Sequence, residues 1–234
     1  ADPEAGLVLA FAFASVPAIA TVMAGYGSNN KYSFIGFERS VAQTIAYEIP
    51  LVISAAAVVP LVPLFLDQAN PLQLSHIVAA QQGPLYGVEG IPIPNWFLFT
   101  QPVAAVLFFV ALLAEVGRNP FDLPEAGSEL IAGYMTEYGG ANFAILFLTE
   151  FAHIFLGSAI FVALFLGGGD GPILPEAVWV LIKMFALFIV IQWLHATIPR
   201  VRIDQLIKIG WKRLLELSFL NLLITAAVIW VVIA

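Results

Sequence analysis

Six long apolar stretches alternate with polar segments along this chain. A helix needs about 20 mostly apolar residues to cross the ~30 Å hydrocarbon core of a bilayer. The strict alternation of apolar and polar residues that a membrane β-barrel requires is absent, and a helix satisfies its own backbone groups in lipid. The pattern therefore predicts an all-α integral membrane protein, a bundle of six transmembrane helices at residues 7–26, 44–66, 96–116, 143–166, 177–197 and 214–234.

The composition supports this prediction. Hydrophobic residues make up 61% of the 234 residues and charged residues only 11%, whereas a soluble domain carries about a quarter charged residues. No linker divides the sequence, so we expect residues 1–234 to form a single transmembrane helical domain. The absence of cysteine excludes disulfides, thiolate-held iron–sulfur clusters and cysteine nucleophiles from this chain. Because the first apolar run begins close to Ala1, we expect the N-terminal helices of a longer protein to be missing.

The cations are distributed unevenly over the loops. Eight of the nine Lys and Arg residues lie in the first, third and fifth loops between the predicted helices, and the ninth is Lys183. The second and fourth loops contain none. The positive-inside rule therefore places the first, third and fifth loops on the cytoplasmic side.

The third loop is strongly acidic. Residues 114–138 carry a single cation, Arg118, and five carboxylates: Glu115, Asp122, Glu125, Glu129 and Glu137. An ionisable group in a membrane costs ~2.5–3.5 kcal/mol on insertion scales and is by default a functional candidate. We therefore expect this segment to handle protons, ions or a polar ligand at the membrane surface.

Helix capping explains part of the same pattern. Asp122 and Glu125 have the spacing of a capping box, with a proline in the first turn. Glu125 and Glu129 would then lie one turn apart, where like charges repel. Glu115 is predicted at the C-terminal end of a helix, and a carboxylate gains nothing from the helix dipole there. We expect a structural cap at Asp122 and a functional placement for Glu115 and Glu129.

Three further ionisable residues fall within the predicted helices. Lys183 lies about two turns into the fifth helix, where it is either paired with a carboxylate for packing or a link in a buried proton path. Glu150 and His153 are three residues apart in the fourth helix and so share one face. A membrane histidine is usually hydrogen-bonded to a neighbour, but a glutamate beside it at that depth favours a functional pair.

Longer motifs carry a family resemblance. The segment 114–125 (AEVGRNPFDLPE), with ELIAGY at 129–134 and TEY at 136–138, resembles the signature of the quinone-site membrane subunit of respiratory complex I, its H or first mitochondrially encoded subunit. Further stretches agree with it: GSNNKYS at 27–33, AQTIAYE at 42–48, PNWF at 94–97 and WLHATIPRVRIDQL at 193–206. The resemblance runs from the first predicted helix to the last. It implies that the chain holds the last six helices of an eight-helix fold.

The resemblance also implies a function. The family's membrane protein forms a quinone chamber with a peripheral arm and couples quinone reduction to proton translocation in a proton-pumping NADH:quinone oxidoreductase. Quinone would be the substrate, with no covalent cofactor and no metal in this chain, and no nucleic acid among the partners. The expected partners are other membrane subunits, peripheral iron–sulfur subunits and the lipid bilayer.

Residues are carried over from the family by motif. The charge path beneath the chamber is expected to contain Glu48, Glu115, Glu129, Glu137, Glu150 and Lys183. The residues expected to face the quinone chamber and the peripheral arm are Arg118, Asp122, Glu125, Arg200, Arg202 and Asp204. The sequence departs from the family at Gly127, where a further Glu is common, at His195, where an Arg is usual, and at Glu38, where an apolar residue is common.

Other functions are compatible with parts of the pattern. Related complexes oxidise reduced deazaflavin, ferredoxin or hydrogen, so the equivalent subunit of such a dehydrogenase or membrane-bound hydrogenase is one alternative. A stand-alone ion or proton transporter using the same carboxylates is a second. A b-type cytochrome with His153 and His195 as haem ligands is a third.

Overall fold

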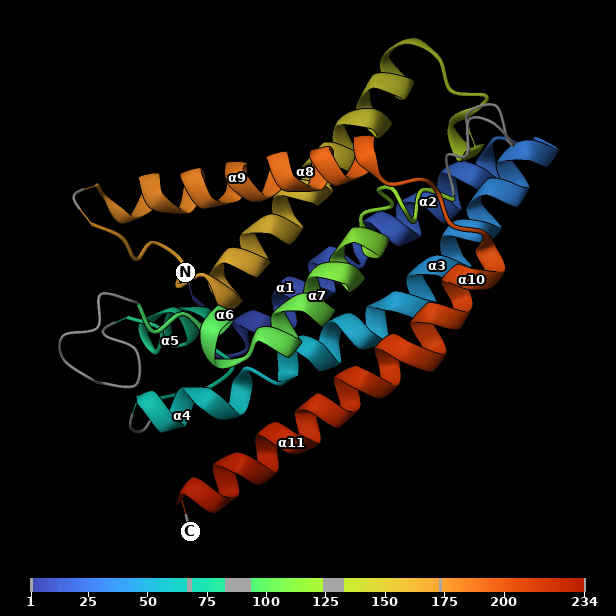
Figure 1. The fold of residues 1–234 in the computed structure, drawn as a ribbon. Coiled ribbons are helices and arrows are strands. Elements are labelled where there is room, and N and C mark those ends of the chain that lie inside the picture. The colour runs from blue at the N-terminus through green and yellow to red at the C-terminus, as the bar shows by residue number, and fades with distance from the viewer. Residues whose placement is uncertain (1, 67–68, 83–93, 124–132, 173, 234) are drawn as a thin grey trace.

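The computed structural model describes residues 2–66, 69–82, 94–123, 133–172 and 174–233. Their regular secondary structure is helical (Figure 1), as the sequence predicts. Glu125 and Glu129 lie outside the described residues. The α-helices are α1 (Gly6–Ala14), α2 (Val16–Gly27), α3 (Lys31–Ala56), α4 (Val62–Phe65), α5 (Leu74–Ala79), α6 (Phe97–Thr100), α7 (Pro102–Glu115), α8 (Gly140–Phe165), α9 (Glu176–Thr197), α10 (Ile203–Ile209) and α11 (Leu215–Ile233). Short 3-10 turns, η1 (Val59–Leu61) and η3 (Gly133–Met135), and a π-helical turn, η4 (Gly210–Leu214), complete the set.

Helix α3 is the centre of the bundle. It packs against α2, α7 and α11, and Figure 1 shows these helices running side by side. Helix α8 contacts α7, while α9 packs against α8 at the edge of the bundle (Figure 1). Aromatic side chains fill the space between α7 and α8: the ring centroid of Phe108 lies 6.0 Å from that of Phe161 and 5.5 Å from that of Phe165.

The outer faces of the bundle are apolar. On α9 only Lys183 and Ile191 are buried, whereas Ile189 and Trp193 are 64% and 70% exposed. Apolar side chains turned outward along a helix are suited to contact with lipid. Among the residues that the structure describes, five helices are long and apolar enough to cross a membrane: Gly6–Gly27, Lys31–Phe65, Gly140–Phe165, Glu176–Thr197 and Ile203–Val231. The chain is therefore an integral membrane protein.

The predicted count of six spanning helices is not confirmed. The stretch predicted at 96–116 is divided at Gln101 into α6 and α7. Pro102 begins α7, where a missing N–H costs no helical hydrogen bond. At 1.5 Å per residue α7 covers about 21 Å, which is less than the ~30 Å of hydrocarbon in a bilayer.

Two predicted helix boundaries are wrong for one reason. Helix α3 begins at Lys31 rather than at residue 44, and the last helical rod begins at Ile203 rather than at residue 214. The side chain of Asn30 caps α3 by accepting the N–H of Tyr32 at 3.0 Å. An apolar run marks only the part of a helix that can lie in lipid, so it does not reveal the polar extensions of the same helix.

The connections group at two ends of the bundle. The α2–α3 and α9–α10 connections and the described parts of the α7–α8 connection lie at one end (Figure 1), and each falls within or beside a predicted loop that carries cations. Glycines allow close packing there. A Cβ on Gly36 would lie 2.9 Å from the backbone nitrogen of Tyr134, so η3 can rest on α3 only at a glycine. Likewise, a Cβ on Gly210 would lie 2.9 Å from the carbonyl oxygen of Ala46.

Candidate functional site

Helix α7 ends partway along α3. The carbonyl of Ala114, in its last turn, accepts a hydrogen bond from Nε2 of Gln43, which lies about 18 Å along α3 from Lys31. The chain then leaves helical geometry and forms an irregular segment, the 116–123 loop. Within a membrane bundle, irregular backbone is tolerated only where it is buried in protein or lines a cavity.

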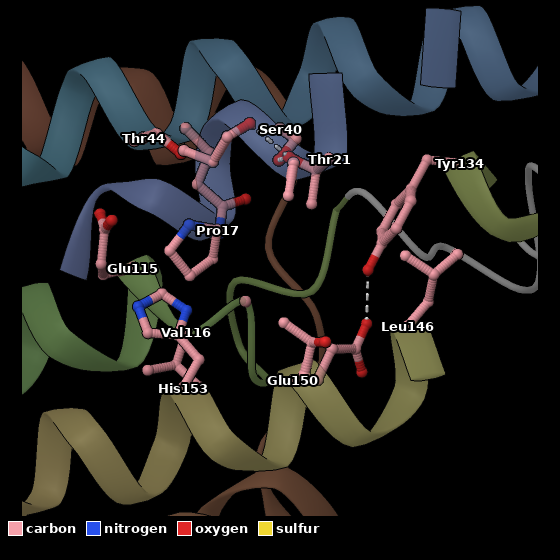
Figure 2. A pocket seen from close by; sticks show the side chains of 15 residues that line it. Pro17, Thr21, Ser40, Thr44, Glu115, Val116, Tyr134, Leu146, Glu150 and His153 are labelled. Carbon is pink, nitrogen blue, oxygen red and sulfur yellow. Dashed lines mark hydrogen bonds between the residues drawn. The ribbon is translucent and has the colours of Figure 1, made fainter. Parts of the chain in front are cut away.

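Part of the 116–123 loop lines a cavity of about 750 Å³ that it shares with α2, α3, η3 and α8 (Figure 2). Glu115 brings the last turn of α7 into the lining, and part of this space is open to solvent. Among the described residues, no group of three or more His, Asp or Glu side chains is placed to hold a metal ion. The polar residues of the lining are Thr21, Ser40, Gln43, Thr44, Glu115, Tyr134, Thr149, Glu150 and His153.

Glu150 is held on both carboxylate oxygens. The hydroxyl of Tyr134 donates to Oε1 at 2.8 Å, as Figure 2 shows, and Nη2 of Arg118 lies 3.5 Å from Oε2. The Arg118 and Glu150 side chains are only 8% and 15% exposed. The guanidinium of Arg118 also lies over the ring of Phe151, with its carbon 5.3 Å from the centroid. A buried charge needs such partners, so Glu150 is the anchored carboxylate of the cavity.

Glu115 occupies a different part of the cavity. In Figure 2 it lies with His153 on the side away from the Tyr134–Glu150 hydrogen bond. Its Oε2 is buried and accepts no hydrogen bond from any residue that the structure describes. Glu48, half-buried on α3, lies close enough for the two charges to repel each other. Two neighbouring carboxylates with an unsatisfied oxygen between α3 and α7 are costly when both are charged.

The 116–123 loop is fastened to the connection between α9 and α10. Nη2 of Arg200 pairs with Oδ2 of Asp122 at 3.1 Å, and the N–H of Val201 donates to the carbonyl of Pro120 at 3.0 Å. The sequence predicts that Asp122 caps a helix together with Glu125. Its ion pair with Arg200 adds a different role, and the proposed partner Glu125 lies outside the described residues.

Three other predicted site residues lie near the surface of the same end. Arg202 pairs with Asp204 at 3.4 Å, with both side chains more than three-quarters exposed (81% and 77%). Together with Arg39 and Arg200 they line an open pocket of about 980 Å³. Glu137 is exposed and accepts a hydrogen bond from Nδ2 of Asn30, so it does not line the cavity that holds Glu115 and Glu150.

Lys183 lies elsewhere. Its ammonium group donates to three backbone carbonyls, those of Leu166 at 2.6 Å, Gly168 at 2.9 Å and Asp170 at 2.8 Å. It also lies 4.5 Å from the ring centroid of Trp96. The last carbonyls of a helix have no partner within it, so Lys183 closes the C-terminal end of α8. This contact is about 24 Å along α8 from Glu150. Asp170 is also close enough for its carboxylate to attract the Lys183 charge, and the predicted place of Lys183 in a proton path stays a prediction.

Some residues of the site carry no sequence signal of their own. Tyr134 stands within a quoted motif, yet only the fold brings its hydroxyl to Glu150. Gln43 also stands within a motif, AQTIAYE at 42–48, but its contact with α7 does not follow from the motif. Thr21 and Ser40 do not stand out, because single polar residues are common in membrane helices. The spacing of Glu150 and His153 does predict their shared face, and both line the cavity.

The chain is similar to known proteins over nearly its whole length. The family model described as NADH dehydrogenase matches residues 1–226. The H subunit of NADH-quinone oxidoreductase from Dehalococcoides mccartyi is 44% identical over 225 residues, covering 96% of this chain and 58% of the relative. The protein of the same name from Geobacillus kaustophilus is 42% identical over 233 residues, covering 97% and 64%. That from Protochlamydia amoebophila is 42% identical over 226 residues, also covering 97% and 64%. The chain thus spans about three-fifths of the length of these curated relatives.

Proposed function

The chain belongs to the NADH dehydrogenase family, and we propose that it acts as the quinone-site membrane subunit of a proton-translocating NADH–quinone oxidoreductase. In this proposal, the chain forms a quinone chamber with peripheral iron–sulfur subunits and passes the charge changes of quinone reduction to the membrane arm. The three relatives share the name of the H subunit of NADH-quinone oxidoreductase, which supports the activity of the complex. The loop end would face the cytoplasm, because the cations gather there.

The observation that carries the proposal is the cavity beside the 116–123 loop. It brings Glu115 and Glu150 together from α7 and α8, with Glu48 nearby on α3. Quinone reduction takes up two electrons, and the product needs protons or compensating charge close by. Carboxyl groups coupled in a low-dielectric setting respond to such a charge by exchanging protons among themselves.

The carboxylates of this cavity would have different roles. Glu150 is bound by Tyr134 and Arg118, so it would hold a fixed negative charge that orients the loop. Glu115 has an oxygen without a partner among the described residues, so it would be the group that takes up and releases a proton. Glu48 would receive the effect of that proton through charge repulsion and carry it further into the bundle.

The remaining predicted residues would serve the interface with the peripheral arm. Asp122 and Arg200 fasten the 116–123 loop, and Arg202 and Asp204 are open to solvent at the same end. Quinone would reach the loop from the side of the peripheral subunits. Glu125, Glu129 and Glu137 complete the acidic segment on which the resemblance rests.

The experiment is the variant Glu115→Gln in the assembled complex. Glutamine keeps the size and part of the hydrogen bonding but cannot exchange a proton. We expect NADH–quinone electron transfer and proton translocation to fall together, roughly tenfold or more, while the variant still assembles. Glu176→Gln is the matched control, because Glu176 is an exposed carboxylate at the start of α9, far from the cavity. Parent rates and the parent proton-to-electron ratio in Glu115→Gln would refute the proposal.

A further inference from the structure

His195, in the last turn of α9, holds the 116–123 loop through two hydrogen bonds to one residue. The backbone N–H of Asn119 donates to Nδ1 of the imidazole at 3.1 Å. The side-chain amide of Asn119 donates to the backbone carbonyl of His195 at 3.0 Å. Asn119 directly follows Arg118, the partner of Glu150, so this contact fixes the position from which Arg118 reaches the cavity.

The chemistry of the first bond depends on the charge of the imidazole. Nδ1 can accept an N–H only when it carries no proton, which places the proton of the neutral ring on Nε2. A protonated imidazole has two donors and no acceptor, so it would leave the N–H of Asn119 without its partner. Arginine and lysine also lack an acceptor, and neither could replace His195 in this bond.

Charged groups of both signs lie on the elements around His195. The loop supplies Arg118 and Asp122, the segment beyond α9 supplies Arg200, Arg202 and Asp204, and α3 contributes Arg39 to the pocket that Asn119 lines. Helix α8, which packs against α9, contributes Glu150 and His153.

We propose that His195 is a positioning residue that holds the 116–123 loop, and with it Arg118, only while its imidazole is neutral. Protonation of the imidazole breaks the hydrogen bond to Asn119 and loosens the loop. The contact between Arg118 and Glu150 therefore depends on the protonation of His195, which lies outside the cavity. The effect on turnover rests on the function proposed above, whereas the effect on the loop does not. Imidazole is the side chain that ordinarily changes charge between about pH 5 and 8.

The test compares His195→Asn and His195→Phe with the parent in the assembled complex. Asparagine can place its side-chain oxygen close to where Nδ1 lies, so it keeps an acceptor that does not titrate. Phenylalanine keeps a ring but has no acceptor. His76→Asn is the matched control, because Nδ1 of His76 accepts the N–H of Asn70 at 3.0 Å outside the loop end. Two readouts are taken from about pH 5.5 to 8: hydrogen exchange at Asn119, as a protection factor, and NADH–quinone electron transfer.

In the parent, we expect the protection of Asn119 and the turnover to fall together as the pH is lowered. His195→Asn should keep the protection of Asn119 and the turnover at low pH. His195→Phe should lose about tenfold in the protection factor of Asn119 at every pH. His76→Asn should match the parent in both readouts. Parent-like pH dependence of Asn119 exchange in His195→Asn would overturn the inference. Exchange that responds without any change in turnover would overturn the positioning role. Absence of quinone reduction in the parent itself would instead contradict the proposed function.

Discussion

Replacing Arg118 by glutamine removes one half of the buried ion pair in the cavity. At 3.5 Å and an effective dielectric constant of about 20, the attraction is about 5 kcal/mol before desolvation is subtracted. Breaking a buried pair by removing one partner typically costs about 3–5 kcal/mol, since the other charge stays buried alone. The contact with the Phe151 ring adds about 1 kcal/mol, while water reaching the 15% exposed Glu150 reduces the total. We expect Arg118→Gln to lower the free energy of unfolding by about 3 kcal/mol.

A double-mutant cycle in lipid–detergent micelles measures this, with unfolding by denaturant followed through tryptophan fluorescence. Arg118→Gln combined with Glu150→Gln buries no unpaired charge, so it should be about 2 kcal/mol more stable than the sum of the single changes predicts. Arg202→Gln is the control, because the Arg202–Asp204 pair has nearly the same length, 3.4 Å, but is exposed, and should cost at most about 1 kcal/mol. The reasoning from burial would be refuted if the free-energy losses of the Arg118 and Glu150 variants were additive. It would also be refuted if Arg118→Gln and Arg202→Gln lowered the free energy of unfolding equally.

Two further predictions concern contacts that support the site. Lys183→Met removes the donor to the carbonyls of Leu166, at the end of α8, and of Gly168 and Asp170 in the segment that follows. Assembly should therefore fall, with a loss of about 3 kcal/mol in stability, while turnover per assembled complex stays at the parent value. A fully assembled variant with low turnover would contradict this and would support Lys183 as a link in the charge path. Gly36→Ala brings a Cβ to 2.9 Å from the backbone nitrogen of Tyr134, so it should shift Tyr134 away from Glu150 and lower the rate of quinone reduction. Gly139→Ala is the control, because nothing lies within 4 Å of the added carbon, and it should keep the parent rate. Equal rates in the two variants would contradict this prediction and show that η3 moves to accommodate the methyl group.

The helices could be predicted from apolar runs because a membrane span has a minimum length, and five of the runs are long apolar helices in the structure. The ends of the helices could not be predicted in the same way. Arg39 and Gln43 interrupt the apolar pattern of α3, yet the helix continues through them, since polar side chains suit a part of the helix that is not in contact with lipid. The break at Gln101 shows the opposite case: an unbroken apolar run does not require an unbroken helix.

The sequence predicts which residues belong to the candidate site but not how they are arranged in space. Charge in an apolar chain is enough to single out Glu115, Glu150 and Arg118. Their arrangement depends on how far α7 extends along α3, which no local pattern records. Lys183 illustrates the limit most clearly. Its charge suggests a carboxylate partner or a proton path, but backbone carbonyls, which leave no trace in a sequence, satisfy it.

The length of α3 has a consequence for how the protein senses the charge of its membrane. Residues 31–43 extend α3 beyond the predicted apolar span by about 20 Å. Anionic lipid headgroups create a negative surface potential that decays over a Debye length of about 8 Å at physiological ionic strength. The headgroup layer extends about 5–8 Å beyond the hydrocarbon. Lys31 would therefore lie roughly 12–15 Å from the headgroups, more than one Debye length away, where most of that potential is screened. The ionic contacts of this end should respond to the subunits that dock on it and only weakly to the lipid composition of the bilayer.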